Sequence, residues 1–180
     1  MCSSTGNRRF GDRTYVSPSV RTLGQRCLLL IGSIGPVGRC PASGTVAVAV
    51  VGVPLVWLAG RWGVPLWAYL AATVMLGLIG VWIHQVGDRI LGEEDSRKLV
   101  IDELVGYAVA MTAVTPTWQL LSLGFLLERG LDIVKVWPAN WVEKRWPGGW
   151  GVVGDDVVAG LYTMLVLRAV TVLVPDCVGS

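Results

Sequence analysis

The chain has 180 residues, of which 53% are hydrophobic and only 16% are charged, and its mean hydropathy is +0.58. These values are too apolar for an ordinary soluble globule, so they predict a single domain that is integral to a membrane or deeply embedded in it. The net charge of +2 hides an asymmetry, because five arginines lie between Arg8 and Arg26 with only Asp12 to oppose them.

The N-terminal segment, residues 1–30, is basic and rich in Ser and Gly, which predicts a flexible tail on the cytoplasmic side of the membrane. Its apolar stretch, residues 27–31, is too short for a signal peptide. The four cysteines show no metal-ligand spacing and are expected to be isolated thiols, and Cys2 is a candidate for lipidation by its position alone. We expect residues 31–175 to form one helical membrane domain and residues 176–180 a tail.

Residues 31–45 are rich in Gly, Pro and Ser and predict a loop. The loop ends in Ser43-Gly44-Thr45, a helix-start signal whose amides and hydroxyls can bind phosphate, although an ordinary cap explains it equally well. The next apolar stretch, Val46 to Ala59, is interrupted by Pro54. As a helix it reaches only about 20 Å, which is short of a hydrocarbon core about 30 Å thick.

The stretch from Pro65 to Val86 is long enough to span a bilayer, and His84 and Asp88 share one helix face at its end. A lone His there is more often a cap or a surface residue than a catalyst. Asp102 and Glu103 lie in an apolar helix, where a solvated helix edge is the weaker alternative because their neighbours are apolar.

Arg129, Asp132 and Lys135 recur at a spacing that places them along one face of a helix. The alternative is a simple ladder of ion pairs, each worth a few tenths of a kcal/mol. Asp155 and Asp156 follow a glycine-rich loop and open an apolar run. A helix N-cap explains the first aspartate well and the second poorly.

Short turns at residues 60–63 and 115–117 send the chain back on itself, so the polar stretches all come to the end that carries the arginine-rich tail. The sequence therefore predicts an all-α membrane protein of short apolar helical hairpins, with its polar site at the cytoplasmic end and no channel through the bilayer.

Five carboxylates are expected to gather at this end: Asp102, Glu103, Asp132, Asp155 and Asp156. They repel one another unless cations lie among them. Such oxygen-rich sites suit Mg²⁺, Mn²⁺ or Ca²⁺, and no Cys/His cluster suggests zinc. Arg129 and Lys135 beside them suit phosphate, so the pattern predicts phosphoryl chemistry on a phospholipid head group.

Four short motifs now make a family recognisable: His84-Gln85, VIDELVG at 100–106, RGLDIVKVWP at 129–138 and GGWGVVGDDVVAG at 148–160. In this order and spacing they resemble phosphatidylglycerophosphatase A, a bacterial family that removes the terminal phosphate from phosphatidylglycerophosphate. The resemblance implies Mg²⁺-dependent hydrolysis that yields phosphatidylglycerol and inorganic phosphate, an all-helical fold and a place in phosphatidylglycerol biosynthesis. Two prolines of the family pattern are replaced, by Ser43 and by Val136, which loosens two turns without removing a charge.

On this basis each polar residue receives an expected role. The Mg²⁺ ligands are expected to be Asp102, Glu103, Asp155 and Asp156. The phosphate-binding residues are expected to be Arg129, Lys135, Gly44 and Thr45. The catalytic residues are expected to be Asp132, which orients water or adds a metal ligand, Asp156, and His84, which is held by Asp88 and exchanges a proton.

We expect a multi-pass protein of the inner (plasma) membrane whose partners are the phospholipid substrate and the membrane, with no nucleic acid. No activated Ser or Cys is recognisable, so water is expected to attack the phosphate. Two alternatives stay open, a non-catalytic phospholipid-binding relative and a small membrane cation carrier. The carrier predicts charges at mid-helix and at both ends, whereas here they gather at one end.

Overall fold

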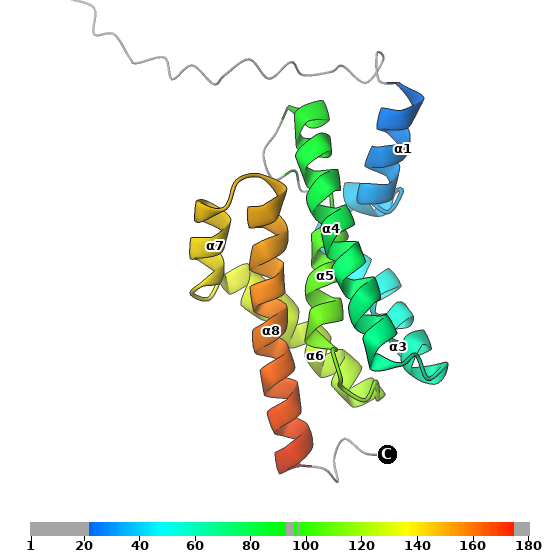
Figure 1. The fold of residues 1–180 in the computed structure, drawn as a ribbon, viewed down its shortest axis with the longest axis vertical. Coiled ribbons are helices and arrows are strands. Elements are labelled where there is room, and N and C mark those ends of the chain that lie inside the picture. The colour runs from blue at the N-terminus through cyan, green and yellow to red at the C-terminus, as the bar shows by residue number, and fades with distance from the viewer. Residues whose placement is uncertain (1–21, 93–95, 97, 175–180) are drawn as a thin grey trace, which may run out of the picture.

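The computed structural model describes residues 22–92, 96 and 98–174, and every regular element within them is a helix (Figure 1). The predicted all-α class is confirmed. The expectations for residues 1–21 and 176–180, Cys2 among them, lie outside the described residues. In chain order the elements are α1 (Leu23–Gly32), the 3₁₀ turn η1 (Val37–Arg39), α2 (Ser43–Ala47), the π-helical segment η2 (Val48–Gly52), α3 (Val53–Arg61), α4 (Leu66–Leu91), α5 (Ile101–Ala110), α6 (Trp118–Val134), α7 (Ala139–Arg145) and α8 (Gly149–Leu173).

Three helical stretches are long and apolar enough to cross a membrane: Ser43–Arg61 with 19 residues, Leu66–Leu91 with 26 and Gly149–Leu173 with 25. At 1.5 Å per residue they measure about 28, 39 and 37 Å, against a hydrocarbon core of about 30 Å. Only a third or less of each apolar window is buried inside the protein. The rest of their apolar surface therefore faces outward, where lipid chains would cover it.

The first of these stretches is longer than the sequence predicted. Pro54 was expected to interrupt it, yet the helix begins at Ser43 and continues past the proline to Arg61. Pro54 lies at the start of α3, and the turn before it widens into η2, in which the Val53 amide donates to the Val48 carbonyl. A wider turn gives room to the proline ring, whose missing amide would otherwise break the helix.

Helix α1 begins at Leu23, inside the segment for which the composition predicted a flexible tail. Thr22 and Gln25 form a capping box at its start, with the Gln25 amide donating to the Thr22 side chain. At its other end the Val100 amide donates to the Gly32 carbonyl at 2.9 Å. Leu28 packs into a cluster with residues of α4 and of the segment before α5, so the helix is part of the folded domain.

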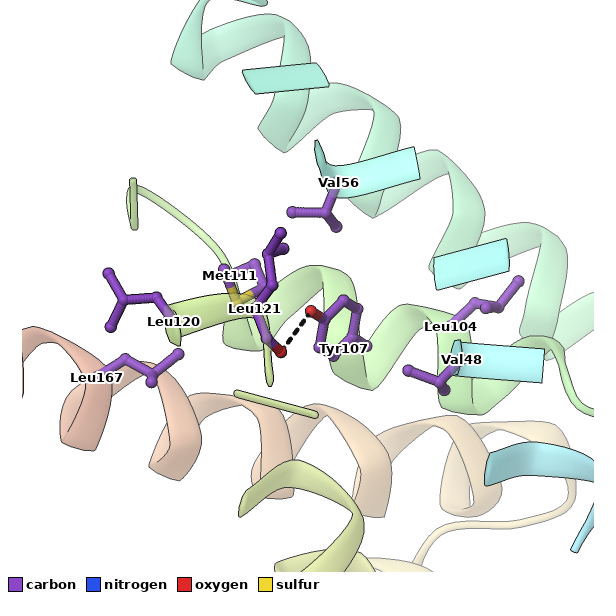
Figure 2. Close-up of a cluster of buried hydrophobic side chains, with 8 residues drawn as sticks. All are labelled: Val48, Val56, Leu104, Tyr107, Met111, Leu120, Leu121 and Leu167. Atoms are coloured by element: carbon purple, nitrogen blue, oxygen red, sulfur yellow. Dashed lines mark hydrogen bonds between the residues drawn. The ribbon is translucent and has the colours of Figure 1, made fainter. Parts of the chain in front are cut away.

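Helix α5 is the centre of the bundle although it has only 10 residues. It packs against α8, α4, α6, η2 and α2. Its Tyr107 is fully buried and donates a hydrogen bond of 3.0 Å from its hydroxyl to the Leu121 carbonyl of α6, as Figure 2 shows. Around this tyrosine lies the main hydrophobic cluster, here named the apolar core: Val48, Val56, Leu104, Tyr107, Met111, Leu120, Leu121 and Leu167.

Helix α8 begins at Gly149, about two turns earlier than the sequence predicted. The early start depends on close contacts, because a Cβ at Gly149 would overlap the Val81 carbonyl of α4. Asp155 and Asp156 consequently lie inside the helix, where they are only 5% and 3% exposed. The interpretation of Asp155 as an N-cap is therefore wrong, since the capping position belongs to Gly148.

The polar segments meet away from the turn between α3 and α4, which lies at the lower end of Figure 1 together with the C-terminal end of α8. The η1–α2 segment, the start of α5, the end of α6 and the first half of α8 surround one cavity. Exposed tryptophans suited to a membrane interface lie on the turns of the lower end and around α7. They are Trp62, Trp67 and Trp118, and Trp137, Trp141, Trp146 and Trp150.

Candidate active site

A cavity of about 750 Å³ lies between the η1–α2 segment and helices α5, α6 and α8. Nearly all of the predicted site residues line it, although they come from four separate parts of the chain. They are Gly44, Thr45, Asp102, Glu103, Arg129, Asp132, Lys135, Asp155 and Asp156. The remaining one, His84, is not among the described residues that line the cavity.

The Arg129 guanidinium is the centre of the site. It donates two charge-assisted hydrogen bonds to Glu128, each of 2.7 Å, and its Nη2 is 3.4 Å from Asp156 Oδ1. Its Nη1 lies 3.3 Å from Asp132 Oδ2 and 3.6 Å from Glu103 Oε1. Burial lowers the pKa of Arg129, but the Glu128 hydrogen bonds and the surrounding carboxylates outweigh this and raise it above the ordinary arginine value. The group is therefore a permanent cation held in a fixed orientation.

Glu128 was missed by the sequence reasoning, although it is fully buried. Its only sequence signal is an acid that follows the apolar residues Leu126 and Leu127 within a helix. The Glu128 carboxylate accepts hydrogen bonds from Nε and Nη2 of Arg129. The third guanidinium nitrogen, Nη1, then points toward Asp132 and Glu103. We regard Glu128 as a residue that positions Arg129.

Lys135 joins three helices at the edge of the cavity. Its Nζ lies 2.6 Å from Glu143 Oε1 of α7 and 3.0 Å from Asp155 Oδ2 of α8. The residue ends α6 in a left-handed conformation, with φ of 48°, which turns the chain toward α7. Glu143 is a second residue that the sequence reasoning missed, because it lies in α7, between the motifs at 129–138 and 148–160 and within neither.

Glu103 approaches the backbone of α2 so closely that a Cβ on residue 44 would overlap its carboxylate. Residue 44 must therefore be a glycine for Glu103 to occupy this position, whatever role its backbone amide has. Burial, followed by the charge of Asp102, raises the pKa of Glu103 to about 8. Its Oε2 is buried and has no hydrogen-bond partner within the described ranges. A carboxylate in this position is short of positive charge.

The donor set fits a hard divalent cation, since Asp102, Glu103, Asp155 and Asp156 all present oxygen atoms to one cavity. The unpartnered Oε2 of Glu103 supports the same fit. Over residues 22–92, 96 and 98–174, however, no three His, Cys, Asp or Glu side chains stand close enough together to hold one ion. The ion pairs explain why, because the Arg129 guanidinium lies among these carboxylates.

Small residues let α5 and α8 approach closely enough to assemble the site. A Cβ at Gly160 would overlap the Gly106 carbonyl, and a Cβ at Gly106 would lie 2.6 Å from Glu128 Oε1 and 3.0 Å from the Asp156 carbonyl. The glycines in the VIDELVG and GGWGVVGDDVVAG motifs therefore have a packing role. They bring Asp156 beside the Glu128–Arg129 pair.

His84 lies behind the site. It is fully buried, and its Nε2 is 3.3 Å from Asp102 Oδ1. Asp88, which the sequence suggested as its support, accepts a hydrogen bond of 3.4 Å from the Ser96 amide. The position of His84 suits a side chain that orients Asp102, since carboxylates that bind metals are themselves held by neighbouring polar groups.

Comparison with known proteins agrees with these motifs. The sequence model described as phosphatidylglycerophosphatase A matches residues 30–171. The Escherichia coli strain K12 protein of that name is 35% identical over 103 residues, which are 56% of this chain and 60% of the relative. The Haemophilus influenzae protein of the same name is 31% identical over 146 residues, which are 79% of this chain and 86% of the relative.

A third relative, from Bacteroides thetaiotaomicron, is 32% identical over 148 residues, which cover 77% of this chain and 90% of that protein; its name refers to a phosphatidylinositol-3-phosphatase. No solved structure matches the chain. The family match covers most of the chain and includes all the residues that line the cavity. The chain belongs to the phosphatidylglycerophosphatase A family.

Proposed function

We propose that this protein hydrolyses the terminal phosphate of phosphatidylglycerophosphate and releases phosphatidylglycerol and inorganic phosphate. Besides the names of the relatives, one structural observation supports this proposal. A single cavity combines five carboxylates with Arg129 and Lys135, and it opens beside helices long enough to cross a bilayer. Such a cavity suits a phosphate carried by a lipid head group.

In this proposal Arg129 and Lys135 bind the phosphoryl group. The Nη1 edge of Arg129 faces the cavity carboxylates, and its planar donors match phosphate oxygens better than a lysine does. Lys135 adds a compact charge from the C-terminal end of the same helix, where Glu143 and Asp155 hold it. Both cations would stabilise negative charge that develops on the phosphoryl oxygens as the ester bond breaks.

We further propose that Mg²⁺ is the cofactor and that Asp102, Glu103, Asp155 and Asp156 hold it. When bound, the ion supplies a Lewis acid that polarises the phosphate. Asp132 contacts Arg129 at the cavity wall and would orient the attacking water or add a further oxygen ligand. His84 would keep the Asp102 carboxylate in one orientation through their contact of 3.3 Å.

The site is proposed to face the cytoplasm, with the protein in the plasma membrane. Basic residues support this orientation, since the positive-inside rule places them in the cytoplasm. At the other end of the described segments lie only two basic residues, Arg61 and Arg168. The basic residues around the site are more numerous: Arg26, Arg39, Arg89, Lys98, Lys144 and Arg145.

The test is phosphate release by the purified protein from phosphatidylglycerophosphate in detergent micelles, with Mg²⁺ and with a chelator. We expect phosphatidylglycerol and phosphate in equal amounts, and no turnover in chelator. Phosphatidylinositol 3-phosphate belongs in the same assay because of the third relative's name. Absence of phosphate release from phosphatidylglycerophosphate would overturn the proposed substrate, and turnover that survives the chelator would overturn the proposed cofactor.

A further inference from the structure

A second, basic cavity adjoins the active site. It measures about 340 Å³ and lies between α1, η1 and the last turn of α4. Its polar wall is formed by Arg26, Arg39 and Lys98, and we name it the basic groove. Gly38, Arg39, Lys98 and Leu99 line both this groove and the active-site cavity, so the two spaces share one wall.

The groove combines two kinds of surface. Leu29, Leu30 and Leu91 also line the groove, and Leu30 is 54% exposed on α1. No acidic side chain among the described residues lines it. The side chains of Arg26 and Arg39 form no ion pair within the described part of the chain. Two arginines without acidic partners, beside apolar side chains, suit an anion that is attached to a lipid.

The backbone that carries these side chains is fixed by close packing. A Cβ on residue 38 would overlap the Lys98 carbonyl, and a Cβ on residue 32 would lie 2.6 Å from the Ile83 side chain. The Val100 amide also donates to the Gly32 carbonyl. The loop that bears Arg39 is thereby held against the segment just before α5. Helix α5 itself carries Asp102 and Glu103.

The proposed substrate carries two phosphates of different kinds. One is the terminal monoester that is removed, and the other is the diester that links the head group to diacylglycerol and remains in the product. We propose that the basic groove binds this diester, with Arg26 and Arg39 as its ligands and the adjacent leucines against the glycerol backbone. This inference rests on the proposed function, and it assigns the second phosphate to a site separate from Arg129 and Lys135.

The first experiment compares Arg26→Gln and Arg39→Gln with Arg89→Gln, a matched control. Arg89 is exposed at the same end of the molecule but does not line the groove. Loss of one charge-assisted contact is expected to raise KM for phosphatidylglycerophosphate about tenfold in each groove variant, with kcat little changed. The inhibition constant of inorganic phosphate, which lacks the diester, is expected to stay the same. An equal rise of KM in Arg89→Gln, or unchanged KM in both groove variants, would overturn the subsite.

The second experiment does not depend on turnover. Native mass spectrometry measures how much phosphatidylglycerol, which bears only the diester, stays bound to the detergent-solubilised protein, with phosphatidylcholine as the zwitterionic comparison. The unaltered protein and Arg89→Gln are expected to retain phosphatidylglycerol preferentially, and the Arg26→Gln/Arg39→Gln double variant is expected to lose that preference. Retention without phosphate release would refute the proposed function and keep the diester site. Equal retention by the double variant would refute the site even in an active enzyme.

Discussion

Two buried regions meet along α5, and they are built in opposite ways. Toward its C-terminal end, Tyr107 and Met111 enter the apolar core, which holds only one side-chain hydrogen bond, from Tyr107 to Leu121 (Figure 2). Toward its N-terminal end, Asp102 and Glu103 face a cavity crowded with charges. The change from one to the other takes about one helical turn.

The comparison separates a region that stabilises the fold from one to which we assign the proposed chemistry. Side chains in the apolar core are stabilised by burial, and other side chains of similar volume would do the same. In the charged region, the carboxylates lose hydration and are only partly compensated by Arg129 and Lys135. Replacing these buried ion pairs with well-packed hydrophobic residues often leaves the stability of a protein unchanged or raises it. The proposed binding of a phosphate and a metal ion would account for these charges.

The largest effect that tests the difference between the two regions is expected for Glu128→Gln, which removes the charge that holds Arg129. We expect turnover to fall about a hundredfold, because Arg129 loses its fixed orientation. The loss of a buried ion-pair partner also costs about 3–5 kcal/mol of stability. Activity assays and thermal unfolding in detergent measure the two effects. Glu143→Gln provides the contrast in stability, because its ion pair with Lys135 is partly exposed and is worth about 1 kcal/mol or less. Equal stability losses in the two variants would contradict the account.

Gly44→Ala tests whether the α2 backbone must approach Glu103. The added methyl would overlap the carboxylate, so Glu103 must move away from the site. We expect turnover to fall about 10- to 100-fold, as small displacements in active sites do. Gly130→Ala is the control, because Gly130 lies in α6 beside Arg129 and an added Cβ there would meet only open space. That variant should keep full turnover and gain up to about 1 kcal/mol from helix propensity.

Leu167→Ala addresses the apolar core. The side chain is fully buried, so its removal is expected to cost about 2–5 kcal/mol of stability. Turnover of the folded protein below its unfolding temperature is expected to change less than about twofold, because Leu167 lies in the apolar core and not at the cavity. Leu165→Ala, two residues away on the exposed face of α8, should change stability by less than about 0.5 kcal/mol. A large loss of kcat in Leu167→Ala would mean that the two regions are not separate.

The smallest expected effect belongs to Tyr107→Phe. It removes only the hydrogen bond to the Leu121 carbonyl and leaves the ring in place. A stability loss of about 1 kcal/mol and unchanged turnover are expected. A shift of the unfolding midpoint as large as that of Leu167→Ala would show that the apolar core depends on this polar contact.

The sequence predicted the class of fold and the gathering of the charges, because both follow from coarse features. Long apolar stretches specify helices, and short turns at residues 60–63 and 115–117 decide which helix ends lie together. The motifs at residues 100–106, 129–138 and 148–160 contain most of the charged residues that line the cavity. The fold class and the gathering of the charges need only the order of apolar and polar residues, whereas the motifs depend on the residue types themselves.

Other features depend on contacts that the sequence does not display. Glu128 resembles an ordinary exposed glutamate until α5 and α8 pack closely at Gly106 and Gly160, beside its carboxylate. The early start of α8 depends on how closely Gly149 fits against α4. The 3.3 Å contact of His84 with Asp102 of α5 was not predicted, because i,i+4 spacing shows only which residues share a face of one helix. In each case tertiary packing decides what local spacing leaves open.

The central claim is that carboxylates from α5 and α8 act together on a phosphate in this cavity. The most direct test is the rate of phosphate release from phosphatidylglycerophosphate by Asp156→Asn, measured over a range of Mg²⁺ concentrations beside the unaltered protein. The substitution keeps the size of a side chain that is 3% exposed and removes its charge. We predict that turnover is lost at every Mg²⁺ concentration while the helical content stays the same. Hydrolysis as fast as that of the unaltered protein would contradict the account.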